Sequence, residues 1–279
     1  GVMQSHNVWI SASEHAIGNF QLREGDVLYC CLPTYNSAAW IAAVYPALIA
    51  GISFGLDPRF SPKTYWERTR FYGATHSFTL GAMTIFLWQA PPRPDDRDNP
   101  VRVASTIPIP EALIEPFKQR FGIEVIMQAY GQSEALTVLR RRDDGVIKFK
   151  PNATGVPAPG FEVRLLDDDD VEVPVGEVGQ ICVRSDQPYT LSTGYFDNPE
   201  ATLASRRNLW YHTGDLARKD EDGQFFFFDR KADYIRYKGR SVSSFAIEAA
   251  VNAHPAVAES AAYGVKSAEL ESEAEIKVE

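Results

Sequence analysis

The first half of the chain alternates between helical and extended patterns of apolar side chains. Apolar positions spaced three and four residues apart predict helices at 5–20, 38–50, 62–72 and 111–121. Short apolar runs bounded by turn residues predict strands at 27–32, 52–56 and 123–127. Helices that alternate with short strands are typical of an α/β fold.

The pattern changes to period two between residues 156 and 228. Alternating positions at 161–166 and 180–184, with turn residues at 167–170 and 220–223, predict a small antiparallel sheet or barrel. The four consecutive aspartates at 167–170 lack the spaced ligands and the closing Glu of a calcium loop, so a solvated hairpin turn is expected. Four consecutive phenylalanines at 225–228 are expected to form a buried strand.

After Asp229 the sequence predicts a second, smaller α+β unit. A polar segment at 231–236 is followed by a predicted helix at 245–253 and a predicted strand at 257–265. Residues 267–279 are acidic and too few to complete such a unit. The predicted domains are therefore 1–229 and 230–279, the second being only the beginning of a domain.

Composition indicates a globular protein and excludes some partners. Hydrophobic residues make up 44% of the chain, which supports a packed core. With 37 acidic and 28 basic residues the net charge is −9, which argues against nucleic acid. The apolar stretch at 38–55 contains Pro46 and is shorter than the ~20 residues of a membrane span. The proline-rich, charged segment at 90–100 is expected to be an exposed loop.

The cysteines and the first residues of the chain indicate a cytoplasmic protein. Cys30, Cys31 and Cys182 are odd in number, form no CxxC pair and have no His at metal-ligand spacing, which favours reduced thiols. The opening residues lack the basic and apolar regions of a secretory signal.

Three short segments carry candidate chemistry. Tyr130-Gly131-Gln132-Ser133-Glu134 follows a predicted strand and offers a ring for stacking, a glycine, a hydroxyl for phosphate oxygens and a carboxylate for Mg²⁺. At 211–215 a carboxylate, Asp215, follows a glycine turn and suits two ribose hydroxyls, although a structural turn has the same pattern. The interleaved charges at 229–239 fit either a hinge or a charged linker.

Together and in this order, the segments resemble the adenylate-forming family of acyl-CoA synthetases, peptide-synthetase adenylation domains and firefly luciferase. Residues 130–134 resemble the family's YGxTE motif, 213–216 its TGDL motif and 230–239 its RxxDxIKxxG hinge motif. Gly176–Gly179, Gly194-Tyr195 and Ile247-Glu248 resemble further family elements. The resemblance implies the N-terminal part of an adenylation-domain α/β sandwich, a small antiparallel β-barrel, and the start of a mobile C-terminal domain.

The resemblance also implies roles for individual residues. ATP, AMP, Mg²⁺, CoA and a small carboxylate are the expected ligands. Tyr130, Gly131 and Gln132 are expected near the adenine and the acyl carbonyl, Ser133 on phosphate, Glu134 on Mg²⁺ and Asp215 on ribose. Arg230 is expected on ribose or phosphate. Ser133, Glu134 and Arg230 are the implied catalytic residues, and Ala232 occupies the hinge position.

Two segments depart from the family pattern. Ser105-Thr106-Ile107-Pro108 stands where the family has glycine-rich residues around adenine, and its larger side chains put nucleotide affinity in question. Tyr35-Asn36 occupies an aromatic-His position that often borders the acyl pocket, with asparagine in place of histidine. The start of the chain, the segment at 63–75, Asp229-Arg230 and 242–248 most resemble carnitine- or crotonobetaine-type CoA ligases.

Two family elements are missing from the printed sequence, namely the phosphate-binding loop and the late lysine of the PxxxxGK motif. The chain by itself is therefore expected to be inactive, either as part of a longer acid:CoA ligase or as a binding module that holds nucleotide or acyl-CoA without turnover. A peptide-synthetase adenylation domain is a further alternative. Apolar surface where subdomains are lacking would favour association between copies.

Overall fold

The structure, a computed structural model, describes all residues except 238–239, 253, 255, 258–259 and 267–273. The chain forms two compact units, which are treated separately. Unit 1 comprises residues 1–162 and 185–204, and unit 2 comprises 163–184 and 205–279. These units are defined by the contacts within them. The predicted domains 1–229 and 230–279 are separated instead at the expected hinge, and they stay a prediction.

Unit 1 is built on a seven-stranded sheet in the order β3-β2-β4-β5-β6-β7-β8. Five strands run parallel, and β7 and β8 extend the sheet in antiparallel fashion. The strands are β2 (Val27–Cys30), β3 (Ser53–Leu56), β4 (His76–Leu80), β5 (Val103–Ile107), β6 (Val125–Gln132), β7 (Ala135–Arg142) and β8 (Val156–Pro157). A separate pair joins β1 (Val2–Met3) to β11 (Gly194–Tyr195).

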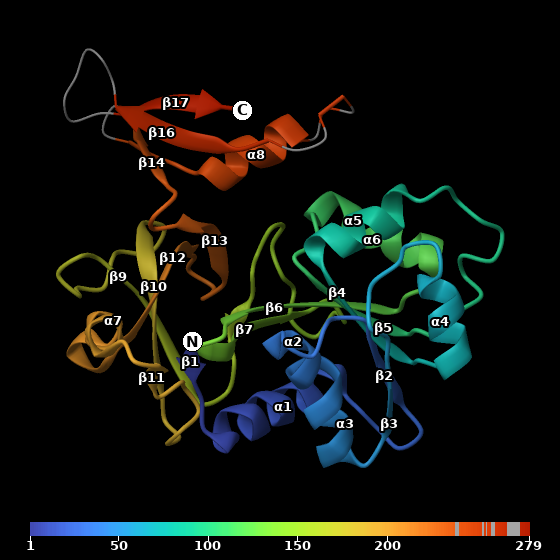
Figure 1. Ribbon diagram of the computed structural model, residues 1–279. Helices are drawn as coiled ribbons and strands as arrows, with labels where there is room; N and C mark the ends of the chain where they lie inside the picture. Colours follow the sequence, from blue (N-terminus) through green and yellow to red (C-terminus); the bar gives the residue numbers. More distant parts are fainter. Residues whose placement is uncertain (238–239, 253, 255, 258–259, 267–273) are drawn as a thin grey trace. The chain divides into compact units, whose positions relative to one another are not determined.

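Helices cover both faces of this sheet, as the predicted α/β pattern requires (Figure 1). On one side lie α1 (His6–Phe20), α2 (Ser37–Ala39), a π-helical turn at Trp40–Val44 and α3 (Tyr45–Ala50). On the other side lie α5 (Gly81–Gln89) and α6 (Glu111–Phe121). The remaining helices of unit 1 are α4 (Tyr65–Tyr72) and α7 (Pro199–Ala204).

Local sequence signals explain where these helices begin and end. Ser5 caps α1 by accepting a hydrogen bond from the Val8 amide. Gly73 and Gly122 end α4 and α6 in the left-handed conformation, which costs glycine little. All four predicted helices of this half are confirmed, and the one predicted at 62–72 begins at Tyr65.

The sequence analysis missed several elements of unit 1, including the eight-residue strand β7, and misplaced two features. It did not predict β4, β5 or α5, because their apolar runs carry buried hydroxyl groups or lack a single apolar face. Strand β6 continues to Gln132, beyond the predicted end at residue 127, so the turn falls at 133–134. The 90–100 loop is not wholly exposed: Asp96 is buried and pairs with Arg120, the two side chains 2.7 Å apart.

Unit 2 contains the predicted antiparallel sheet, in the order β13-β12-β10-β9. Its strands are β9 (Phe161–Leu166), β10 (Val178–Ser185), β12 (Tyr211–Lys219) and β13 (Phe225–Arg230), with a 3₁₀ turn at Arg207–Leu209. Residues 161–162 and 185, at the ends of β9 and β10, belong to unit 1. Phe225 is fully buried, whereas Phe226, Phe227 and Phe228 are half-buried, so the predicted buried strand is buried mainly at its start.

The C-terminal part of unit 2 contains α8 (Ser244–Asn252) and two strand pairs. Strand β14 (Ile235–Tyr237) pairs with β15 (Arg240–Val242), and β16 (Ala262–Lys266) pairs with β17 (Ala274–Val278). The predicted strand at 257–265 begins only at Ala262, and its residues 258–259 lie outside the described part, as does Ala253 of the predicted helix. The segment 267–279, expected to be too short to complete a domain, contributes strand β17, which pairs with β16 along its whole length.

Within the described residues, no helix combines the length and apolarity that crossing a bilayer requires.

Candidate functional site

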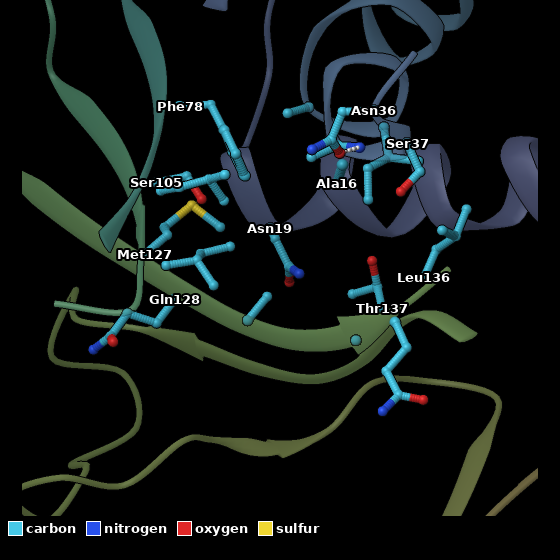
Figure 2. A pocket seen from close by; sticks show the side chains of 18 of the residues that line it. Ala16, Asn19, Asn36, Ser37, Phe78, Ser105, Met127, Gln128, Leu136 and Thr137 are labelled. Atoms are coloured by element: carbon cyan, nitrogen blue, oxygen red, sulfur yellow. Dashed lines mark hydrogen bonds between the residues drawn. The ribbon is translucent and has the colours of Figure 1, made fainter. Parts of the chain in front are cut away.

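Unit 1 contains a cavity of about 330 Å³ at the carboxyl ends of its parallel strands (Figure 2). Leu80 and Ile107, at the ends of β4 and β5, line it together with residues of β6 and β7. Residues of α1 and of the segment that begins α2 complete the wall. Ligands of α/β proteins bind at this edge of the sheet, and a volume of 300–1,000 Å³ is usual for a small-molecule site.

The 130–134 segment supplies one wall of this cavity. Gly131, Gln132 and Ser133 line it, whereas Tyr130 lies within β6, opposite Leu139 of β7. Two backbone contacts hold the turn: the Gln4 side-chain amide donates to the Ser133 carbonyl, and the Ser192 amide donates to the Glu134 carbonyl at 2.8 Å. The Glu134 side chain is half-buried at this turn.

Gly131 is required by the hairpin itself. A Cβ atom on this residue would lie 2.3 Å from the Leu136 carbonyl oxygen and 2.8 Å from that of Ala135. Only a residue without a side chain fits between these backbone groups. The glycine that the sequence analysis assigned to ligand approach therefore has a structural reason as well.

The 105–108 segment lies on β5 and just beyond it. Ser105 and Ile107 line the cavity, and the peptide bond between Ile107 and Pro108 is cis. Thr106 is buried, and its hydroxyl has no hydrogen-bond partner within the described part of the chain. The larger side chains that replace the family's glycines thus belong to a strand whose alternate residues face the cavity.

Tyr35 and Asn36 have different environments, although both were expected at the substrate pocket. Asn36 lines the cavity and caps α2 by accepting a hydrogen bond from the Ala38 amide at 2.9 Å. The Tyr35 side chain is 92% exposed and is not among the lining residues. The sequence analysis missed Asn19, Phe78 and Thr137, which also line the cavity but lie in segments without a recognisable motif.

Asp215 and Arg230 belong to unit 2, where they stand directly opposite each other on β12 and β13. Asp215 is buried and Arg230 is exposed. The Thr213 hydroxyl accepts a hydrogen bond from the Asp215 amide at 3.1 Å and donates to the Ile181 carbonyl at 2.8 Å. Thr213, Gly214 and Asp215 lie within β12, where the sequence analysis expected a glycine turn, and the Thr213 hydroxyl ties this segment to β10.

Asp229, beside Arg230, joins β13 to helix α8. Its Oδ2 atom accepts hydrogen bonds from the Ser244 amide at 2.6 Å and from the Ser244 hydroxyl at 3.0 Å. A carboxylate at the start of a helix satisfies free amides and favours the helix dipole. This contact explains why aspartate stands at the first position of the Asp229-Arg230 pair.

A buried chain of polar groups in unit 2 escaped the sequence analysis. Cys182 Sγ lies 3.3 Å from His212 Nδ1, and His212 Nε2 lies 3.4 Å from Asp170. Burial raises the pKa of the Cys182 thiol to about 12 and lowers the pKa of His212. Asp170 also accepts hydrogen bonds from Arg207 and Asn208, so the turn predicted to be solvated has a largely buried carboxylate at its end.

The other two thiols are buried as well. Cys30 and Cys31 are free and buried, and burial raises their pKa to about 11 and about 12. Reactive cysteines need a lowered pKa and access to solvent.

Comparison with known proteins identifies the family. Residues 1–196 match the family of AMP-binding enzymes. The chain belongs to the AMP-binding enzyme family. This confirms the resemblance drawn from the ordered motifs.

The similar members of this family are about twice as long as the chain. A crotonobetaine/carnitine–CoA ligase of Salmonella heidelberg is 30% identical in an alignment of 276 positions that covers 96% of this chain and 52% of the ligase. The chain thus spans about half the length of the curated relatives it matches. The predicted likeness to crotonobetaine- or carnitine-type ligases is confirmed.

Solved structures of AMP-forming enzymes share the fold. ATP-bound MatB from Rhodopseudomonas palustris has a TM-score of 0.86 at 26% identity, over all of this chain and 54% of MatB. O-succinylbenzoate coenzyme A synthetase from Bacillus subtilis, in complex with ATP and magnesium ion, has a TM-score of 0.86 at 23% identity, over all of this chain and 56% of that enzyme. The fold predicted from the sequence is confirmed.

Proposed function

We propose that this chain supplies the acyl-binding part, and a share of the nucleotide-binding part, of an AMP-forming acid:CoA ligase. The proposed parent reaction joins a small carboxylate to ATP, giving an acyl-adenylate and pyrophosphate, and then transfers the acyl group to CoA. The observation that carries this proposal is the unit 1 cavity, whose wall includes Gly131, Gln132 and Ser133 of the family motif.

The residues around the cavity fit ATP and Mg²⁺. Ser105 and Ile107 of β5 line the cavity, and a nucleotide beside this strand would contact them. The described residues contain no group of three or more side chains that could hold a metal by themselves. This agrees with Mg²⁺, which usually takes one or two carboxylates together with phosphate oxygens and waters. Glu134 would be that carboxylate.

The remaining roles concern positioning and charge. Ser133 would donate to phosphate oxygens, and Tyr130 would lie against adenine. In unit 2, Asp215 would accept from the ribose hydroxyls and Arg230 would stabilise ribose or phosphate. When bound, ATP supplies the electrophilic phosphorus, and Mg²⁺ neutralises charge on the phosphate oxygens. The protein would hold the carboxylate of the acid in line with that phosphorus. Residues 230–279 would move about Ala232 between the two half-reactions.

The chain alone is proposed to bind without turnover. The printed sequence contains neither the family's phosphate-binding loop nor its PxxxxGK lysine. Loss of one preorganised charge contact typically costs about 10²–10³ in rate, and loss of several would leave little.

The experiment is ATP–pyrophosphate exchange with a panel of carboxylates, on this chain and on a version extended through the flanking reading frame. Exchange by the extended version alone is the expected result, and its Glu134→Gln variant should exchange at least about tenfold more slowly. Failure of both versions to exchange, with ATP still bound, would replace the ligase by a nucleotide- or acyl-CoA-binding module. The altered segment 105–108 and Asn36 are the features that favour this second candidate.

A further inference from the structure

The described residues that line the cavity of unit 1 have uncharged side chains. Within the part of the chain that the structure describes, its lining includes no Asp, Glu, Lys, Arg or His side chain. Its polar groups are amides and hydroxyls, among them Asn19, Asn36, Ser105 and Thr137, set among Phe20, Phe78 and other apolar side chains. Figure 2 shows the amide of Asn19 and the hydroxyl of Thr137 within this space, from α1 and β7.

The amide oxygens of three lining residues, Asn19, Asn36 and Gln128, already have donors. Asn19 Oδ1 accepts from Arg140 Nη1 at 2.9 Å, and Asn36 Oδ1 accepts from the Ala38 amide at 2.9 Å. Gln128 Oε1 likewise accepts from the Ile109 amide at 3.2 Å. Each amide therefore offers its NH₂ group to a ligand, and an NH₂ group can only donate.

The positive charge of Arg140, which is bonded to a lining residue, also disfavours a cationic ligand. Arg140 is bonded to Asn19, so a fixed positive charge stands directly behind a lining residue. A cationic ligand would find no carboxylate among the described lining residues to pair with, and burial of an unpaired charge is costly. Among the described residues, the aromatic side chains of the lining are Phe20 and Phe78. Cation recognition by aromatic rings is strongest with tryptophan.

We propose that this cavity selects a short acid whose acyl chain carries a neutral hydrogen-bond acceptor, such as a hydroxyl or keto group, and excludes acyl chains with a quaternary ammonium. The inference rests on the proposed function, because it takes the cavity as the acyl site. The inferred acyl preference differs from the one that the names of the crotonobetaine/carnitine relatives would suggest. The small volume limits the ligand to a short chain.

The test measures the binding of four acids of equal chain length to this chain by ligand-observed NMR. The probes are butanoate, 3-hydroxybutanoate, 3-oxobutanoate and 4-trimethylammoniobutanoate. The hydroxy and oxo acids should bind about 3- to 10-fold more tightly than butanoate, the usual worth of one neutral hydrogen bond. The trimethylammonium acid should bind most weakly.

Two variants connect this preference to the named donors. Thr137→Val and Asn19→Leu should reduce the preference for the hydroxy acid over butanoate to within about twofold. Thr69→Val is the matched control, because Thr69 is buried in α4 and bonded to the Trp66 carbonyl, and it should keep the preference. If Asn19→Leu fails to fold because Arg140 loses its partner, Thr137→Val decides alone.

The outcomes separate this inference from the function on which it rests. Binding of butanoate or of the trimethylammonium acid as tight as that of the hydroxy acid would overturn the selectivity and leave the acyl site standing. A preference that persists unchanged in Thr137→Val would also overturn it. Failure of all four acids to bind would remove the acyl site, and with it both proposals.

Discussion

At the scale of single residues, Gly131 combines a place in the cavity wall with a backbone constraint. A Cβ there would lie 2.3 Å from the Leu136 carbonyl oxygen, so the β6–β7 hairpin would have to open. Gly131→Ala should lower the free energy of unfolding by about 1–3 kcal/mol, the usual cost of overpacking. Urea unfolding followed by circular dichroism measures this difference.

Gly18 provides a control, because alanine at this position should change the free energy of unfolding in the opposite direction. It lies in α1 and is exposed, and a Cβ atom at this position would have no neighbouring atom within 4 Å. Gly18→Ala should therefore raise the free energy of unfolding by up to about 1 kcal/mol, because alanine favours the helix. Equal stabilities of Gly131→Ala and the parent chain would show that the hairpin yields without cost.

The predictability of the site also differs from residue to residue. Ser133 and Asn36 could be predicted from motifs, and both line the cavity. Asn19 and Thr137 could not, because they come from a helix and a strand that only the fold brings together. Tyr35 was misjudged because a motif position does not determine where the side chain points; it is exposed.

At the scale of elements, His76 joins the end of α1 to the start of β4. Its Nε2 atom donates to the Phe20 carbonyl at 3.1 Å, and its Nδ1 atom lies 2.8 Å from the Thr75 hydroxyl. The ring is fully buried, and burial lowers its pKa to about 4. Because a lone histidine within a strand of mixed polarity gives no motif, neither β4 nor this contact was predicted.

The lowered pKa of His76 makes stability depend on pH. The unfolded chain takes up the proton near pH 6.5 and the folded chain only near pH 4, so stability falls as pH decreases between these values. The loss attributable to His76 approaches about 3 kcal/mol at pH 4. Urea unfolding at several pH values should therefore give a shallower decline for His76→Gln than for the parent chain.

His15 and His212 also have lowered pKa values, caused first by burial, so part of the decline will remain in His76→Gln. His254 is an exposed histidine outside these contacts, and His254→Gln should reproduce the parent profile. Parallel profiles for His76→Gln and the parent chain would mean that His76 does not contribute to the pH dependence.

At the scale of the whole molecule, the chain passes between its two compact units three times, after residues 162, 184 and 204. The alternation of patterns predicted the parallel sheet and the antiparallel sheet, but the interleaving could not be predicted. A local pattern assigns residues 185–204 to the region of the antiparallel strands, whereas β11 within it pairs with β1 at the other end of the sequence. Such pairing depends on contacts between distant segments.

The tryptophans report on the two units separately. Trp9, Trp40, Trp66 and Trp88 belong to unit 1, and Trp210 packs with Leu166 and Cys182 in unit 2. Since each unit has its own sheet and core, we expect urea unfolding of a variant that retains only Trp210 to differ in midpoint from that of Trp210→Phe. Both are followed by fluorescence, with circular dichroism of the parent chain as the reference.

This comparison discriminates between the two divisions of the chain. If residues 1–229 unfold as one cooperative body, Trp210 belongs with the other four tryptophans and the midpoints coincide. If the compact units unfold separately, the midpoints differ, and the circular dichroism of the parent chain has a transition at each. We expect the second result, because Trp210 is buried among side chains of unit 2. Coincident midpoints would favour a boundary at residue 229 for folding as well as for motion.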